Sequence, residues 1–331
     1  MTRVLLTGAS SFTGSWIASA LAEMGADVMA PLRGPLDDGD VRRTARLRRA
    51  RAAARVIPDH PTGSSRLLDL VRRSEAFDVV CLHAAEVGDF RRPAYDPYDA
   101  FARNMRGIPA LLGALGEQGC RTLVVTGTVF EADEGAGDQP RAAMGAYGLA
   151  KTLTWQALRY EAEKRGFTVG KVAVANPFGP DEKPGLVSHM MERWIAGEAA
   201  VLRQPRLVRD HVPIQALARA HAAFALALTR KRGLHRIAPS GFAETTAAFA
   251  ERLARAMRPR LGGSCAVVEA AEPPPPGEPR ARHATDDVLA SMPDGDMERL
   301  WDALADGYRP PKSVAVRPGP ESRALAHSAL R

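Results

Sequence analysis

Short apolar runs alternate with longer amphipathic segments through the first half of the chain. The apolar residues Val4, Leu5 and Leu6 precede a Gly-containing turn, and the segment after the turn has a helical period through Ile17 and Leu21. Further apolar runs that read as buried strands lie at residues 26–30, 78–82, 122–125 and 167–174. Strands that alternate with helices predict an α/β fold, here a Rossmann-type doubly wound parallel sheet.

The alternation loses its regularity in the second half of the chain, which predicts a second unit of different architecture. We expect a dinucleotide-binding domain over residues 1–175, with residues 209–235 packing back onto it. A smaller mixed C-terminal substrate-binding domain is expected over residues 176–208 and 236–310. Residues 311–331 are polar and rich in helix breakers, so we expect a mobile tail there.

The first turn has the composition of a phosphate-binding loop. A strand, a glycine-rich turn and a helix place the free N–H groups of the helix N-terminus against an anion, and this arrangement holds a dinucleotide pyrophosphate. Ser11 stands where the middle one of three glycines is usual. A serine hydroxyl can donate to a phosphate, but a serine adopts a positive φ less freely than glycine. The candidate cofactor-binding residues of the loop are Gly8, Ser10, Ser11, Phe12, Thr13 and Gly14.

The end of the second expected strand bears on which dinucleotide binds. No carboxylate that could hold the adenosine ribose of NAD occurs before Asp37. Arg33 stands there instead and could pair with a 2′-phosphate, since its guanidinium is suited to phosphate. We therefore expect NADP, with NAD as the alternative; an ordinary loop arginine is the other interpretation of Arg33.

Small and hydroxyl residues follow two of the other strands. Ala84 and Ala85 leave room for a cofactor that crosses the strand ends, and His83 is expected to be a turn or cofactor-side residue rather than a general base. Thr126 and Thr128 lie at the carboxyl end of the strand at 122–125, which is the edge where open α/β sheets bind ligands. Thr126 is expected to hydrogen-bond a substrate carbonyl or the hydroxyl of a nearby tyrosine.

Tyr147 and Lys151 are the candidate proton-transfer pair. They are four residues apart in a long amphipathic segment, so on a helix they share a face. An ammonium beside a tyrosine lowers the pKa of the phenol, and the pair can then exchange a proton near neutral pH. On spacing alone, an ordinary surface tyrosine and lysine is the commoner interpretation.

Several motifs together resemble the extended short-chain dehydrogenases/reductases, in the NAD-dependent epimerase/dehydratase family and its nucleotide-sugar branch. The resemblance runs from residue 3 to about residue 308. The residues that carry it are Thr7, Gly8, Ala9, Phe12 and Gly14 in the first loop, Asn104 and Gly107, Thr126, Tyr147 with Lys151, the turn at residues 176–180, and the segment at residues 209–214.

The resemblance implies a role for each matching residue. Thr126 would polarise the substrate oxygen, Tyr147 would transfer the proton, and Lys151 would bind the nicotinamide ribose and lower the pKa of the tyrosine. Asn176 and Arg209 match positions that hold a substrate diphosphate, to which forked guanidinium donors are suited. Arg280 or Arg282 would add to this anion site, with a surface-loop role as the alternative.

The implied activity is the reduction of a keto group on a nucleotide-diphosphate sugar, with an epimerase or isomerase that retains NAD(P) as the alternative. A carbonyl reductase acting on other compounds and a non-catalytic dinucleotide sensor are further alternatives. Family dehydratases follow the threonine with an acidic pair, whereas Gly127 and Thr128 follow it here, so a dehydratase is not expected. The resemblance also implies a homodimer formed through helices beside the site, with Trp155 and Leu158 serving either the core or the dimer contact.

The distribution of charge argues against a nucleic-acid-binding protein. Within the net charge of +7, seven arginines crowd one alanine-rich segment: Arg42, Arg43, Arg46, Arg48, Arg49, Arg51 and Arg55. No aromatic residues are interleaved, so we expect a solvated helix face, or a surface that attracts an anionic cofactor or substrate, and no nucleic-acid partner.

The three cysteines lie far apart, with neither metal-ligand nor disulfide spacing, so we expect no metal and a reducing cytoplasm. The chain has no run of about 18 apolar residues and no signal-peptide layout, so no membrane partner is expected.

Overall fold

The computed structural model describes residues 1–309 apart from 37–38, 87, 89–91, 93, 271, 275–276, 291 and 294. The expected tail at residues 311–331 and Asp37 lie outside these described residues. Among the described residues, no helix combines the length and apolar character needed to cross a membrane.

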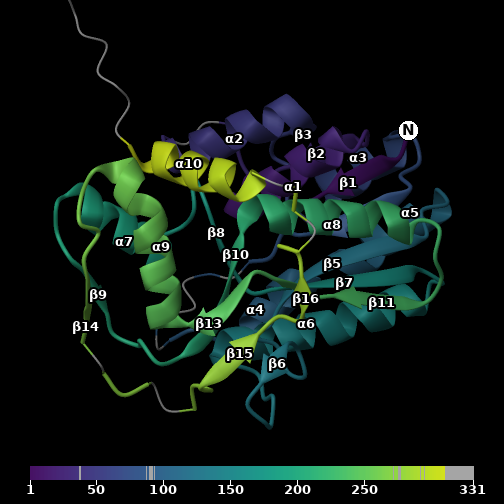
Figure 1. Ribbon diagram of the computed structural model, residues 1–331. Helices are drawn as coiled ribbons and strands as arrows, with labels where there is room; N and C mark the ends of the chain where they lie inside the picture. The colour runs from purple at the N-terminus through teal and green to yellow at the C-terminus, as the bar shows by residue number, and fades with distance from the viewer. Residues whose placement is uncertain are drawn as a thin grey trace, which may run out of the picture.

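The larger unit is a seven-stranded sheet in which every neighbouring pair is parallel (Figure 1). The chain order reverses between β1 and β4, and ligands bind at such a switch point, outside the carboxyl ends of the strands. The expectation of a Rossmann-type doubly wound sheet is therefore confirmed. In sheet order the strands are β11 (Leu234–Ile237), β7 (Thr168–Val174), β5 (Thr122–Thr128), β4 (Val79–Leu82), β1 (Arg3–Leu6), β2 (Asp27–Pro31) and β3 (Arg55–Ile57).

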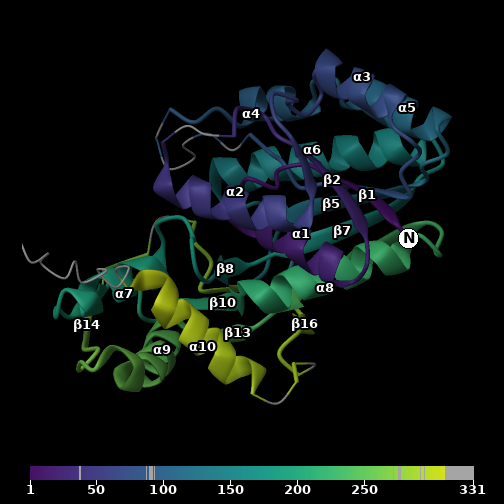
Figure 2. The same ribbon diagram turned by 90° about the horizontal axis from the view of Figure 1, so that it is seen from above.

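Helices cover both faces of this sheet, as the view from above shows (Figure 2). One face carries α1 (Phe12–Glu23), α2 (Val41–Ala53) and α8 (Ile214–Leu228). The other face carries α3 (Ser65–Arg73), α4 (Pro97–Met105), α5 (Ile108–Glu117) and α6 (Gly145–Glu163).

Side chains of the central strands alternate between two buried cores. Val124 of β5 belongs to the core beneath α1 and α8, whereas Val125 belongs to the core beneath α5 and α6. Trp155 and Leu158 of α6 are buried in the second core, so of the two alternatives they serve the core.

The smaller unit lies beyond the carboxyl ends of the parallel strands (Figure 1). It contains a mixed sheet in the order β13 (Phe242–Thr245), β10 (Val208–Pro213), β15 (Ala281–His283) and β6 (Ala136–Gly137), with β8 (Asn176–Phe178) also paired to β10. Two short parallel pairs join β12 (Pro239–Ser240) to β16 (Asp286–Asp287) and β14 (Val267–Glu269) to β9 (Ala200–Leu202).

The helices of the smaller unit are α7 (Leu186–Ile195), α9 (Thr246–Leu261) and α10 (Asp296–Tyr308). They enclose a third apolar core in which Phe178 stacks on Trp301 and packs edge-on against Phe249. This core holds the second sheet against its helices, as the aromatic pairs bury large apolar areas.

The arginine-rich segment forms α2, and part of it joins the two units. Arg46 is buried and donates from Nε and one terminal nitrogen to the backbone oxygen of Asp181, at 2.8 and 2.5 Å. Arg49 pairs with the carboxylate of Asp181 at 2.9 Å and covers the ring of Trp16. The expectation of a solvated arginine face is therefore wrong for Arg46 and Arg49, because these guanidinium groups satisfy acceptors in the segment that follows β8.

Candidate active site

The first loop closes tightly against the end of β4. The hydroxyl oxygen of Thr7 accepts hydrogen bonds from the backbone N–H groups of His83 and Ala84 at 3.1 and 3.0 Å, which ties the ends of β1 and β4 together. Gly8 has a φ of +79°, and a Cβ there would lie 2.8 Å from the nitrogen of Ala84. A Cβ on Gly14 would lie 2.2 Å from the oxygen of Gly8. Both positions therefore require glycine, and the loop leaves a helix N-terminus open to an anion.

Ser11 begins the helix of this loop. Its φ is −78°, so the left-handed conformation of the turn falls on Gly8 and the serine carries no backbone strain. The hydroxyl oxygen accepts the N–H of Gly14 at 3.0 Å, which is an N-cap, and also lies 3.1 Å from Nε2 of His83. Ser10 and Thr13 flank this cap, and Phe12 is buried in the core.

Arg33 follows β2 with its side chain 75% exposed. It forms an ion pair of 3.4 Å with Glu86, which a phosphate could replace at little cost because exposed pairs are weak. Glu86 is itself held in place by Asn104. The side chain of Asn104 exchanges two hydrogen bonds with the backbone of Glu86, at 2.7 and 3.2 Å, just beyond Ala84 and Ala85. The Asn motif of the sequence thus fixes the loop after β4.

Tyr147 and Lys151 lie on the first turns of α6, and the lysine reaches the end of β5. Its Nζ donates to the backbone oxygen of Thr126 at 2.9 Å. Burial lowers the pKa of Lys151. The pKa of Tyr147 is raised, first by burial and then by the negative charge of Glu131. The lowering expected from Lys151 is therefore not found, because burial and nearby negative charge determine the direction of the shift.

The side chain of Thr126 is held by two histidines. Strand alternation places it on the same face as Val124, the face covered by α8, and its hydroxyl lies 3.0 Å from Nδ1 of His83 and 3.1 Å from Nε2 of His221. Burial lowers the pKa of His83 to about 3 and that of His221 to about 4, so both rings are neutral at physiological pH. His221 was not among the residues expected from the sequence. Its one signal there is a histidine on the otherwise apolar face of a long helix.

A charged cluster occupies the opposite face of β5. The ammonium of Lys171, on β7, forms ion pairs with the carboxylates of Glu131 and Glu134, the latter at 2.8 Å, and lies over the ring of Trp155. A Cβ on Gly127 would lie 2.5 Å from Glu131 Oε1, so the glycine makes room for this cluster. Sequence reasoning missed all three charges, although a lysine within an apolar strand is a visible signal.

The residues expected to bind a substrate diphosphate are largely engaged by the protein. Asn176 donates to the backbone oxygen of Asp210 at 3.1 Å. Arg209 is 8% exposed, and its terminal nitrogens donate to the backbone oxygens of Val208, Arg280 and Pro279 and to the carboxylate of Glu278. A diphosphate role for Arg209 would therefore require it to exchange these partners.

The two further arginine candidates differ in exposure. Arg280 is exposed, whereas Arg282 is 2% exposed and donates to the backbone oxygens of Val129, Glu131, Glu134 and Ala142. Arg282 thus shapes the loop that leads from β5 to α6, and neither the surface-loop role nor the anion-site role describes it.

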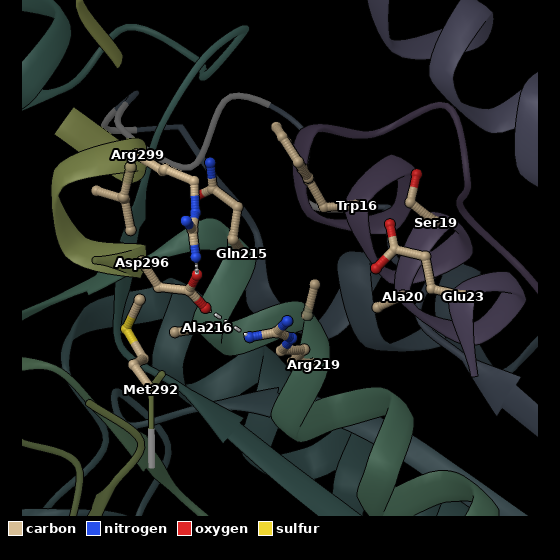
Figure 3. Close-up of a pocket in the computed structure, with 12 residues that line it drawn as sticks. Trp16, Ser19, Ala20, Glu23, Gln215, Ala216, Arg219, Met292, Asp296 and Arg299 are labelled. Carbon is tan, nitrogen blue, oxygen red and sulfur yellow. Dashed lines mark hydrogen bonds and ion pairs between the residues drawn. The ribbon is translucent and has the colours of Figure 1, made fainter. Parts of the chain in front are cut away.

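A pocket of about 230 Å³ lies away from these residues, between α1, α8 and α10 (Figure 3). Trp16, Glu23 and Gln215 line it, and Arg219 pairs across it with Asp296. It adjoins the helical stretch of α1 rather than the loop at residues 8–14, and none of the candidate catalytic residues lines it. We therefore place the candidate site at the carboxyl edge of the sheet, where the first loop, the end of β5 and the start of α6 meet.

The fold and the edge site define a dinucleotide-binding α/β protein with a tyrosine–lysine pair. The model of the NAD dependent epimerase/dehydratase family matches residues 4–237. The chain belongs to this family, as the sequence resemblance implied, and is an enzyme of the short-chain dehydrogenase/reductase type. Among curated proteins, none matches the sequence significantly.

Solved structures share the fold along nearly the whole chain. UDP-glucose 4-epimerase from Thermotoga maritima, solved with UDP-glucose, is 21% identical with a TM-score of 0.69, and the match covers 93% of this chain and 99% of that one. UDP-glucuronic acid 4-epimerase from Bacillus cereus, solved with UDP-glucuronic acid and NAD, is 18% identical with a TM-score of 0.70 and the same coverage. UDP-N-acetylglucosamine 4-epimerase from Methanobrevibacter ruminantium is 17% identical with a TM-score of 0.70, over 93% of this chain and 98% of that one.

Proposed function

We propose that the protein is a nucleotide-sugar 4-epimerase that uses bound NAD(P) for transient oxidation of the sugar. The observation that carries this is the contact between Lys151 and the backbone of Thr126 at the edge of the sheet, next to the phosphate-type loop. Three similar structures that are titled UDP-sugar 4-epimerases support the same activity. They favour the epimerase alternative over the reductase that the sequence first suggested.

A bound dinucleotide would supply the hydride acceptor, and then the hydride donor, for transient oxidation of the sugar. The chain's own groups handle the proton and the position. As the phenolate, Tyr147 would accept the proton of the sugar hydroxyl and later return it. The ammonium of Lys151 would have to stabilise that phenolate against the burial and the charge of Glu131, which raise its pKa. The Gly8–Gly14 loop holds the pyrophosphate at the N-terminus of α1.

A reductase that exchanges its cofactor remains the second candidate, and Arg33 is the observation that favours it. Its exposed guanidinium at the end of β2 suits the 2′-phosphate of NADP, and NADPH is the dinucleotide that a reductase consumes. A homodimer and a cytoplasmic location remain predictions from the sequence.

Tyr147→Phe tests the proton-transfer role. Loss of the hydroxyl is expected to lower kcat by about 10²- to 10⁴-fold, because the proton then has no acceptor, while cofactor affinity stays within about twofold. Tyr160→Phe, an exposed tyrosine on the same helix, is the matched control and should keep full activity. Normal turnover in Tyr147→Phe would rule out the assigned role.

Arg33→Ala tests the choice of cofactor. If the guanidinium meets a 2′-phosphate, its loss should weaken NADP binding by about 10- to 100-fold and leave NAD binding unchanged. Arg48→Ala, which removes an exposed arginine from α2, should change neither. Titration of each variant with both dinucleotides measures the ratio, and equal effects on NAD and NADP would contradict the assignment.

A further inference from the structure

Four side chains form a continuous hydrogen-bonded chain from the phosphate loop to β5. Ser11 Oγ lies 3.1 Å from His83 Nε2, His83 Nδ1 lies 3.0 Å from Thr126 Oγ1, and Thr126 Oγ1 lies 3.1 Å from His221 Nε2. This series of hydrogen bonds begins at the N-cap of α1 and ends on α8, so it connects the expected pyrophosphate site with the strand that carries Thr126. The role inferred below for these side chains rests on the proposed function, in which Thr126 is catalytic.

The direction of the protons is constrained at the His221 end. Nδ1 of His221 is buried and forms no hydrogen bond of good geometry among the described residues, although the backbone of His221 itself acts on the ring and raises its pKa. A buried N–H without an acceptor is rarer and costlier than a buried acceptor without a donor. The proton of His221 therefore belongs on Nε2, and this ring donates to the hydroxyl oxygen of Thr126.

His83 then decides what Thr126 can do, because a hydroxyl has one proton and two lone pairs. If His83 carries its proton on Nδ1, it is a second donor to Thr126, and the threonine keeps its own proton for a substrate ketone. If His83 carries the proton on Nε2, the threonine must donate to Nδ1, and one lone pair is left to accept from a substrate alcohol.

Ser11 decides between these two tautomers. When its hydroxyl donates to Nε2 of His83, the ring proton must be on Nδ1. When its hydroxyl donates to a phosphate oxygen, Ser11 can only accept from His83, and the ring proton must be on Nε2. The two roles expected from the sequence, Ser11 as a phosphate donor and Thr126 as a donor to a ketone, are therefore mutually exclusive in this geometry.

We propose that His83 and His221 are positioning residues for the reaction, and that binding of a pyrophosphate at the first loop switches Thr126 from hydrogen-bond donor to acceptor through the tautomer of His83. His221 is a fixed donor in both states. The acceptor state suits a sugar alcohol that is about to be oxidised, which is the first step of an epimerase. Only hydrogen bonds rearrange, so no co-reactant is needed.

Nitrogen-15 NMR of histidine-labelled protein reads the tautomers directly. Signals are assigned with His83→Asn and His221→Asn, and ADP-ribose serves as a probe that carries the pyrophosphate without the nicotinamide. Before addition, His83 should be protonated on Nδ1 and His221 on Nε2. At saturation, His83 should shift to Nε2 while His221 stays unchanged.

The groups that face His83 are Ser11, Thr126, His221, Lys151 and Lys183, and the positive charges among them oppose protonation of the ring. The rings of His83 and His221 should therefore remain neutral between pH 6 and 8. The exposed His189 and the half-buried His235 report any change that is not specific to these two histidines. Titration of His83 as an ordinary cation within this range would overturn the tautomer argument.

Ser11→Ala provides the second variant. It removes the hydrogen bond between the loop and His83 but leaves both imidazole rings in place, so ADP-ribose should no longer change the tautomer of His83. The proposal is overturned if wild-type His83 keeps one tautomer at saturation, if Ser11→Ala switches as the wild type does, or if ADP-ribose does not bind. If the tautomer of His83 switches but the protein converts no nucleotide sugar, the coupling between the loop and Thr126 is supported and only the proposed function is contradicted.

Kinetics separate positioning from general structural damage. The amide oxygen of Asn at position 83 can accept the hydroxyl proton of Thr126 near the site of Nδ1, whereas Leu offers no acceptor. His83→Leu should lower kcat by about tenfold or more with KM for the sugar unchanged, and His83→Asn should recover most of that loss. Equal kcat values in the two variants would overturn the role of Nδ1 as the acceptor for Thr126.

Discussion

Two polar clusters flank β5, and they differ in the interactions that compensate for the loss of water around their polar groups. On the α8 side, Thr126 and its two histidines are neutral, and hydrogen bonds compensate them. On the α6 side, Lys171 and its two glutamates are compensated as charges. A series of neutral hydrogen bonds can exchange donors and acceptors at little cost in free energy, whereas a buried ion cluster resists any change of charge. The neutral cluster of Thr126 and its histidines is therefore suited to a role in the reaction, and the charged cluster of Lys171 to stabilising the fold.

Lys171→Met should give the largest effect on stability. It leaves the buried carboxylate of Glu131 without its cation and leaves Glu134 with only the guanidinium of Arg236, at 3.4 Å. Breaking a buried pair costs about 3–5 kcal/mol of unfolding free energy. Lys164→Met, at the exposed residue that follows α6, should change the free energy of unfolding by no more than about 0.5 kcal/mol. Urea unfolding measures both, and similar values for the two variants would remove the contrast between the clusters.

Acid should destabilise the protein through the neutral cluster. The pKa values of His83 and His221 are lowered to about 3 and about 4 on folding, so the unfolded chain binds more protons below its own histidine pKa of about 6.5. Their contribution to stability is complete above that pH and is lost as the pH falls toward the folded values. Between pH 7 and pH 5 the loss is about 2 kcal/mol for each histidine.

His83→Asn isolates one of these contributions. The variant should lose about 2 kcal/mol less than the wild type between pH 7 and pH 5, because its side chain does not titrate. His189→Asn, at an exposed position, should follow the wild type. Parallel curves for His83→Asn and the wild type would mean that His83 is not held neutral by the fold.

Glu131→Gln should give the smallest effect. The amide keeps an oxygen for the backbone N–H of Thr128, and Lys171 retains the carboxylate of Glu134, so the cost is about 1–2 kcal/mol. A cost equal to that of Lys171→Met would show that the cluster depends on both carboxylates rather than on compensation of the lysine.

The sequence was informative wherever a role depends on local spacing. Gly8, Gly14, Tyr147 and Lys151 are set by a turn or a helical period, and the structure places them together at one edge. The parallel sheet was predictable for the same reason, because strand and helix periods are local properties.

Roles that depend on what lies opposite a side chain were not predictable. Arg209 and Arg282 looked like anion-binding residues, but their guanidinium groups are occupied by backbone oxygens that come from distant parts of the chain. His221 and Glu131 become polar partners only through helix and strand packing. The pKa of Tyr147 moves upward because of burial, which the sequence does not specify, and the negative charge of Glu131.

The most direct test of the proposed epimerase follows the hydride. The protein is incubated with UDP-glucose or UDP-glucuronic acid deuterated at C4, and the product and the dinucleotide are analysed together. We predict a 4-epimer that retains its deuterium, with no net consumption of NADH or NADPH. Absence of any epimer, together with consumption of one NADPH for each molecule of a UDP-4-keto sugar supplied in its place, would contradict the account and establish the reductase.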